Sequence, residues 1–296
     1  MIRTLKSLGP IGVARVVIVY AGIAAFAAMV MGGCTGKLRN PIDATYEHLA
    51  AKALADGHEA MLARDYAAAD RYYGRALSFQ PDLAEAHAGA GRVAEVQGDL
   101  SAAIGHFRSA VKNAPDSSAY ALALGDAILR QAVTSMNRNE MIEAALRSYR
   151  HGLAVDERCA KAAIGIGMCH RVAGRIDLAI ESYKHAQRID DASAEPHVLL
   201  AAAYESRSQY NRAMREYRLA LKLAPEDPKL HNACAAMNAR LAQHGGPSER
   251  IARQRALAHY RRSLELDPEQ PRVREAMAMI EPATRTWMAG GNSNGE

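Results

Sequence analysis

The chain has 296 residues, of which 49% are hydrophobic and 23% charged, so it can build a sizeable core and is not globally disordered. Aromatic residues make up only 5% of it and alanine is abundant, a balance that favours packed helices over strands. Arg3, Lys6 and Arg15 precede Cys34 with no acidic residue among them. Without these three, the chain has 34 basic and 32 acidic residues. This near balance argues against a nucleic-acid-binding protein.

Residues 1–33 have the layout of an export signal. The three basic residues come first, and an apolar run of 16 residues follows from Val16 to Met31. Because a membrane-spanning helix needs about 20 apolar residues, the run predicts a cleaved signal peptide. An uncleaved membrane anchor remains the alternative.

The sequence MGGC, which ends at Cys34, resembles the lipobox of bacterial lipoproteins, with Met31 where leucine is usual. The resemblance implies that a lipid such as palmitate is attached to Cys34 and that residues 34–42 form a lipidated tether. Thr35 stands where an inner-membrane retention signal would have aspartate. The expected location is therefore the bacterial cell envelope, in the outer membrane facing the periplasm. The alternative is a secretory or anchor segment that happens to contain a cysteine.

The next segment contains an internal repeat of 34 residues. Small residues, an aromatic and a proline recur in step: Ala69, Tyr73, Ala76 and Pro81, then Ala103, Phe107, Ala110 and Pro115. A second set has the same spacing: Ala179, Tyr183, Ala186 and Asp191, then Ala213, Tyr217, Ala220 and Pro225. This pattern resembles the tetratricopeptide repeat (TPR), a helix-turn-helix unit.

The resemblance implies an all-α fold, a right-handed TPR superhelix (α-solenoid) of about six repeats with a C-terminal capping helix. It covers residues 43–281, with repeats starting near Ala50, Ala84, Ser118, Ala160, Ala194 and Pro228. Insertions are expected near 130–146, with a turn at 137–139, and near 243–252, where Gly245, Gly246 and Pro247 interrupt the helices. They either elaborate a binding face or are variations in loop length. The capping helix is predicted over 271–280, and residues 282–296 are predicted to be a disordered tail.

In TPR domains the first helix of each repeat lines a concave groove. Carried over to this chain, the groove positions mix charges of both signs with apolar side chains, which suits a protein or peptide segment as partner. The residues expected to bind it are Arg92, Glu95, Leu122, Asp126, Lys161, Met168, Arg171, Val198 and Glu205. The alternative is that these side chains only solvate the groove. The carboxylate clamp of chaperone-binding TPR domains is excluded, because Ala88 and Arg92 stand at its positions.

The sequence indicates no enzyme, metal site or cofactor apart from the lipid on Cys34. It has no Gly-rich phosphate loop, no zinc-binding histidine spacing and no serine-nucleophile motif. Cys159, Cys169 and Cys234 are expected to be buried free thiols, and His170 a core histidine.

The resulting hypothesis is a membrane-anchored TPR scaffold that binds protein partners in an envelope assembly such as a pilus or secretion machine. The order of signal, lipobox and six repeats resembles that of pilotins and Tad pilus-assembly lipoproteins. Two alternatives remain: a periplasmic adaptor for proteases or murein enzymes, and an uncleaved, inner-membrane-anchored chaperone-like module. The sequence does not indicate the oligomeric state.

Overall fold

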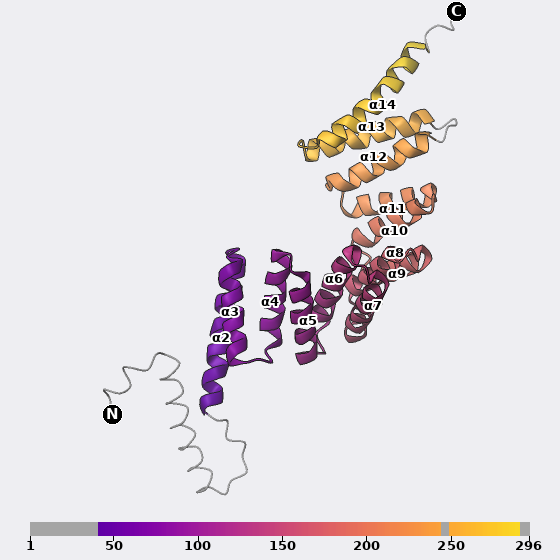
Figure 1. The fold of residues 1–296 in the computed structure, drawn as a ribbon. Helices are drawn as coiled ribbons and strands as arrows, with labels where there is room; N and C mark the ends of the chain where they lie inside the picture. The colour runs from indigo at the N-terminus through magenta and orange to yellow at the C-terminus, as the bar shows by residue number, and fades with distance from the viewer. Residues whose placement is uncertain (1–40, 244–248, 291–296) are drawn as a thin grey trace, which may run out of the picture. The chain divides into compact units, whose positions relative to one another are not determined.

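The structure, a computed structural model, describes residues 41–243 and 249–290, with side chains over 43–243 and 249–281. These residues form thirteen α-helices and no strand (Figure 1). The chain divides into two compact units, Met1–Pro115 and Asp116–Glu296. The predicted all-α fold is confirmed.

Four helices of the first unit are described, and they form two consecutive pairs. α2 packs against α3 and α4 against α5, and α3 also contacts α4, which joins the pairs. Their bounds are α2 Pro41–Leu62, α3 Tyr66–Phe79, α4 Ala84–Gln97 and α5 Leu100–Asn113.

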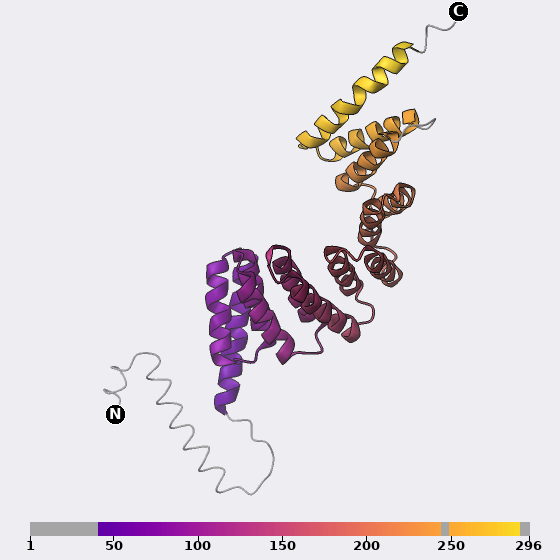
Figure 2. The ribbon, with the colours of Figure 1, turned by 45° about the vertical axis from the view of Figure 1, so that its right-hand side comes forward.

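The second unit contains four pairs and a final single helix. α6 pairs with α7, α8 with α9, α10 with α11 and α12 with α13, and each pair packs on the next (Figure 2). The last helix, α14, packs on α13, where Val273 is buried against Ala235 and Tyr260. The bounds are α6 Ser118–Thr134, α7 Arg138–Val155, α8 Ala160–Val172, α9 Ile176–Ile189, α10 Glu195–Ser206, α11 Tyr210–Leu223, α12 Pro228–Gln243, α13 Glu249–Leu266 and α14 Pro271–Gly290.

The repeated alanines are fully buried between the packed helices. Ala69, Ala103, Ala179 and Ala213 have no exposed surface, and the alanine seven residues after each is equally buried. A larger side chain at these sites would force the helix axes apart, since helix separation depends on the side chains at the contact. The 34-residue period therefore results from the need for small residues where helices pack.

The repeated aromatic rings fill slots that two successive repeats build together. The Tyr149 ring is 1% exposed and lies between Gly125 of its own repeat and Gly165 of the next. A Cβ atom on either glycine would come within 3.0 Å of the ring. Tyr73 occupies the same kind of slot between Gly57 and Gly89. The glycines thus make room for a ring that joins one repeat to the next.

The turn within a regular repeat passes through a left-handed residue at its fifteenth position. Gly98 and Gly174 adopt φ of 84° and 74° there, while Arg64 and Ser208 adopt 58° and 57° without being glycine. A left-handed residue ends a helix efficiently, and glycine adopts it without steric cost. The following helix is capped in the first unit, where the Asp65 carboxylate accepts from the Ala68 N–H at 2.9 Å.

Three boundaries differ from the sequence prediction. α2 begins at Pro41, nine residues before the predicted start of the first repeat. Near 130–146 the extra residues lengthen α6 and α7, so the turn lies at 135–137 and Arg138 already belongs to a helix. α14 continues to Gly290, beyond the predicted end at 280. The predicted tail stays a prediction; its residues 291–296 lie outside the described part of the chain, as do residues 244–248 of the second insertion.

Within residues 41–243 and 249–290, no helix is long and apolar enough to cross a membrane. The predicted signal peptide and Cys34 lie outside these residues.

Candidate functional site

The predicted groove residues lie on the first helix of successive pairs. Arg92 and Glu95 are on α4 in the first unit. The other seven are in the second unit: Leu122 and Asp126 on α6, Lys161, Met168 and Arg171 on α8, and Val198 and Glu205 on α10. The seven come from three consecutive pairs, so the second unit is where a continuous binding face is expected.

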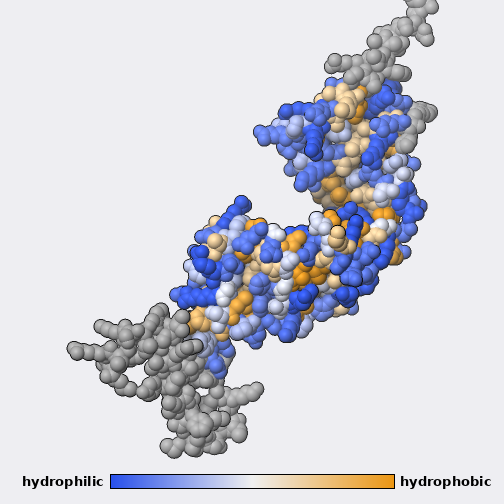
Figure 3. Space-filling view, in the orientation of Figure 1, coloured by the Kyte–Doolittle hydropathy of each residue, from blue (hydrophilic) through white to orange (hydrophobic). Residues whose placement is uncertain are grey.

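The apolar members of this set are half-buried. Met168 and Val198 both pack on the core cluster that contains Tyr183 and Leu200, and Leu122 lies beside Gly152 of α7. They therefore contact the core while part of each side chain stays exposed. On the face of the molecule shown in Figure 3, hydrophobic residues lie in patches bordered by hydrophilic ones.

Of the three acidic members, the two in the second unit, Asp126 and Glu205, are bonded within the protein. Asp126 accepts a hydrogen bond of 2.5 Å from the hydroxyl of Tyr149. Glu205 accepts one of 3.4 Å from the hydroxyl of Tyr217 and also pairs with Arg240 of the next repeat. Burial and then the Glu205 charge raise the pKa of Tyr217 to about 12. These two carboxylates hold the rings that fill the slots between repeats, a function that the sequence analysis missed.

The cationic members are exposed to solvent. Lys161 makes no ion pair with another described residue, and Arg171 lies near the hydroxyl of Tyr183. Burial raises the pKa of Tyr183, and the Arg171 charge acts in the opposite direction. Glu205 is paired with Arg240, whereas the exposed Asp126 is bonded only to a neutral hydroxyl and keeps its negative charge, so the face offers a ligand charges of both signs.

A row of arginines joins successive repeats of the second unit, and the sequence analysis missed it as well. Arg175 pairs with Glu143 at 2.9 Å, Arg207 with Asp177, and Arg240 with Glu205. Arg138 donates to the carbonyl of Val172 at 2.7 Å. Each contact links residues 30 to 35 positions apart, about one repeat. The sequence feature that could have indicated this row is a basic residue near the turn of each repeat from the third to the sixth.

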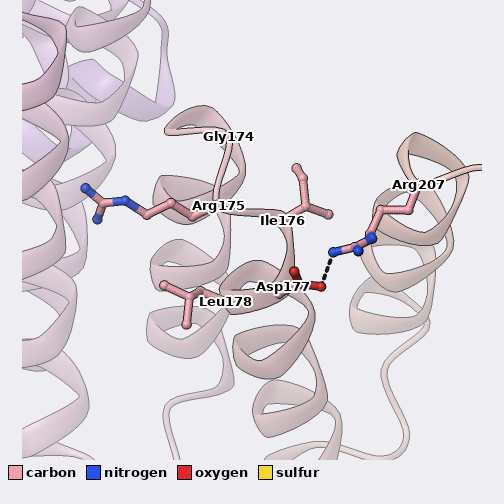
Figure 4. A pocket seen from close by; sticks show the side chains of 6 residues that line it. All are labelled: Gly174, Arg175, Ile176, Asp177, Leu178 and Arg207. Atoms are coloured by element: carbon pink, nitrogen blue, oxygen red, sulfur yellow. Dashed lines mark hydrogen bonds and ion pairs between the residues drawn. The ribbon is translucent and has the colours of Figure 1, made fainter.

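A shallow hollow of about 410 Å³ lies beside this row, at the turn between α8 and α9. It is lined by residues 174–178 and Arg207. In Figure 4 the Arg207 side chain reaches toward Asp177 while Arg175 points away from it. The two opposite charges that face each other in this hollow, Asp177 and Arg207, already form an ion pair. The hollow is therefore better suited to contact between repeats than to catalysis.

The described part of the chain contains three free thiols and no group of side chains suited to a metal ion. Cys169 and Cys234 are fully buried, Cys159 is half-buried, and all three are free thiols. No group of three or more histidine, cysteine or acidic side chains is placed to hold a metal ion there. His170 is 7% exposed, in the position expected of a core residue.

Comparison with protein families and known proteins gives a consistent result. Tetratricopeptide-repeat models match residues 54–118, 97–132, 137–194 and 194–227. Among curated proteins, none matches this chain. The matching structures include TTC0263, a TPR protein of Thermus thermophilus, with 24% identity and a TM-score of 0.53 over 64% of this chain and 98% of that one. PilF of Pseudomonas aeruginosa has 14% identity and a TM-score of 0.60 over 79% and 99%. MamA has 20% identity and a TM-score of 0.52 over 61% and 94%.

Proposed function

Since the chain belongs to the tetratricopeptide-repeat family, whose members are typically non-enzymatic scaffolds for protein–protein interaction, we propose that it is a lipid-anchored scaffold of the bacterial envelope. It binds protein or peptide segments along the first helices of its repeats. The assembly that it serves is a pilus or secretion machine at the outer membrane.

The anchoring part of the proposal is supported by the sequence at the N-terminus. The basic start, the apolar run of 16 residues and the sequence MGGC occur in the order that a lipoprotein signal requires. Two or three acyl chains on Cys34 would hold the protein at a membrane, because each buried methylene contributes about 0.8 kcal/mol.

The choice of a pilus or secretion machine is supported by architecture alone. The order of signal, lipobox and repeats resembles that of pilotins, and the chain shares its fold with PilF of Pseudomonas aeruginosa over almost the whole of that protein.

The binding part of the proposal depends on one observation. On the first helices of two consecutive pairs, α8 and α10, exposed surface remains on Lys161, Arg171, Met168 and Val198. Partly exposed apolar side chains next to unpaired charge suit an amphipathic peptide, which needs apolar anchors and polar contacts that fix its orientation.

Intact mass spectrometry of the chain extracted from bacterial membranes tests the anchor. A mature form that begins at acylated Cys34 is expected, whereas Cys34→Ala is expected to carry no acyl chain and to retain residues 1–33, because acylation precedes cleavage in this pathway. An unaltered chain that retains residues 1–33 would contradict lipidation and favour the uncleaved anchor. A Cys34→Ala chain that is processed like the unaltered one would also contradict lipidation.

Site-specific photocrosslinking in cells tests the binding face. A photoreactive residue in place of Lys161 is expected to capture an envelope protein. The same residue in place of Lys184, which is exposed on the second helix of the same pair, serves as the matched control. Equal capture at both positions, or capture at Lys184 alone, would refute binding at the first helices.

A further inference from the structure

Three helices near the end of the second unit carry an excess of positive charge that the preceding part of the chain lacks. Residues 207–266, which contain α11, α12 and α13, include 12 basic and 5 acidic residues. Residues 41–206 include 17 basic and 22 acidic ones. Complementary charges bring partners together and exclude partners of the wrong sign, so this asymmetry indicates a surface for an acidic partner.

Three of the basic residues form a stripe along α11. Arg215, Arg218 and Lys222 follow each other at intervals of three and four residues, so they lie on one face of the helix. All three are exposed, and none has an ion pair or hydrogen bond with another residue in the described part of the chain. The one acidic residue of this helix, Glu216, is bonded to His197 of α10 at 2.8 Å. The positive charge of the stripe is therefore available to a partner.

Two leucines border this stripe. Leu219 and Leu223, which directly follow Arg218 and Lys222, are 40% and 41% exposed. More than half of each residue is thus covered by the protein, and the leucines do not protrude as side chains that enter a membrane would. They form a shallow apolar edge on which an apolar side chain of a partner protein can pack.

A hollow of about 390 Å³ lies at the N-terminal end of the stripe, between the turn that precedes α11 and the end of α12. It is lined by residues 208–212, Arg215 and Leu241. Arg212 has a fixed position there, because its guanidinium donates to the side-chain oxygen of Gln209 at 3.0 Å and lies 5.8 Å from the centre of the Tyr204 ring. A guanidinium held in place can bind a carboxylate through two N–H groups. A side chain of a partner protein can enter this hollow, whereas the surface of a membrane cannot.

The corresponding helix of the second repeat has two of the cations without the leucines. Arg108 and Lys112 of α5 occupy the repeat positions of the second and third cations of the stripe, and both are exposed. Ser109 and Asn113 stand in place of the leucines, and Gly105 stands in place of the first cation. The combination of three cations with an apolar edge is therefore not a requirement of the repeat.

We propose that α11 and the hollow beside it form a basic face that binds an acidic segment of a partner protein. Carboxylates of this segment pair with Arg215, Arg218 and Lys222, and its apolar side chains pack on Leu219 and Leu223. The basic face lies on the second helix of its repeat. It is therefore a binding surface separate from the groove on the first helices, and it does not depend on the lipid anchor.

Binding of a fluorescein-labelled peptide to the full chain, measured by fluorescence anisotropy, tests the basic face. The probe is a synthetic peptide of 14 residues, the length of α11, in which pairs of glutamates alternate with pairs of leucines. Arg218→Gln/Lys222→Gln is expected to weaken binding by about tenfold, which corresponds to about 1.4 kcal/mol for two exposed ion pairs. The matched variant Arg108→Gln/Lys112→Gln removes the same charges from α5 and is expected to leave the affinity unchanged.

A third variant, Leu219→Ser/Leu223→Asn, introduces the polar residues of α5 and is expected to weaken binding although the charges remain. Circular dichroism establishes that each variant is folded, and all the substituted residues are exposed. Absence of peptide binding by the unaltered chain, or equal losses in the α11 and α5 charge variants, would overturn the proposal. Binding to phosphatidylglycerol vesicles that is lost in Arg218→Gln/Lys222→Gln, while the peptide binds that variant and the unaltered chain equally, would overturn it in favour of a membrane.

Discussion

At the scale of single residues, substitutions are most restricted where the backbone is left-handed or the side chain is fully buried. The fifteenth residue of four repeats is left-handed, whether it is glycine or not. The thiols of Cys169 and Cys234 lie in the core, where burial raises the pKa of each. Both features predict effects that can be measured.

Arg64→Gly is expected to stabilise the protein by about 0.5 to 1 kcal/mol. A left-handed conformation costs a residue with a Cβ roughly 1–2 kcal/mol, and this gain exceeds the loss from a more flexible unfolded chain. The midpoint of urea unfolding measures the change. Gly98→Ala, at the equivalent turn, has space around it and is expected to lose about 1 kcal/mol. A lower midpoint for Arg64→Gly would contradict this account.

Cys159 is expected to react with a thiol reagent at pH 8 while Cys169 and Cys234 do not. The thiolate is the reactive form, and burial raises the pKa of Cys169 to about 12 and that of Cys234 to about 11. Peptide mapping by mass spectrometry after a short exposure to iodoacetamide identifies the modified residues, and the urea-unfolded chain serves as the control. Modification of Cys169 as fast as that of Cys159 would show that the core opens readily.

At the scale of helices, the sequence predicted the start of most repeats because the pattern records packing. α4, α6 and α8 begin at Ala84, Ser118 and Ala160, where repeats were expected. The first insertion was expected as a longer turn, but its residues extend two helices. Local turn signals cannot tell these outcomes apart, because a helix that packs on its partner can continue through residues of modest propensity.

The candidate site was less predictable from the sequence than the helices. Asp126 and Glu205 were expected to face a ligand, yet each accepts a hydrogen bond from the tyrosine of its own repeat. These contacts join residues 23 and 12 positions apart on different helices, so they depend on how the helices pair. The same limit applies to the row of arginines, whose partners belong to neighbouring repeats.

Gly165→Ala is expected to destabilise the second unit by about 1 to 3 kcal/mol, the usual cost of overpacking a core. The new methyl group would meet the Tyr149 ring, which has no free space in its slot. Gly105→Ala is the matched control: it lies within α5, has open space around it and is expected to stabilise by up to about 1 kcal/mol. The free energy of unfolding of both variants, measured in urea, tests this expectation. Equal effects of the two substitutions would contradict a tightly filled slot for Tyr149 between Gly125 and Gly165.

At the scale of the whole molecule, each of the two units is a series of helix pairs in which a pair packs on its neighbours in sequence. In such arrays stability is approximately a sum of pair stabilities and nearest-neighbour contacts. The arginine contacts of the second unit add little to that sum, because exposed ion pairs contribute about 0–1 kcal/mol each. Their effect is to fix which residues of successive pairs meet. The second unit is thus suited to holding a long face in a defined register.

The packing of α14 on α13 is also expected to affect how copies of this protein behave toward each other. Successive pairs of the second unit bury apolar faces against one another, and α14 covers the last such face with Val273, Met277 and Ile280. A chain that ends after Pro268 would expose Tyr260 and Ala235 and become able to stack on other copies. Concentration-dependent association in sedimentation velocity is expected for this truncated chain and not for the full one. We therefore expect the terminal helix to prevent end-to-end polymerisation by covering the face on which another copy would stack.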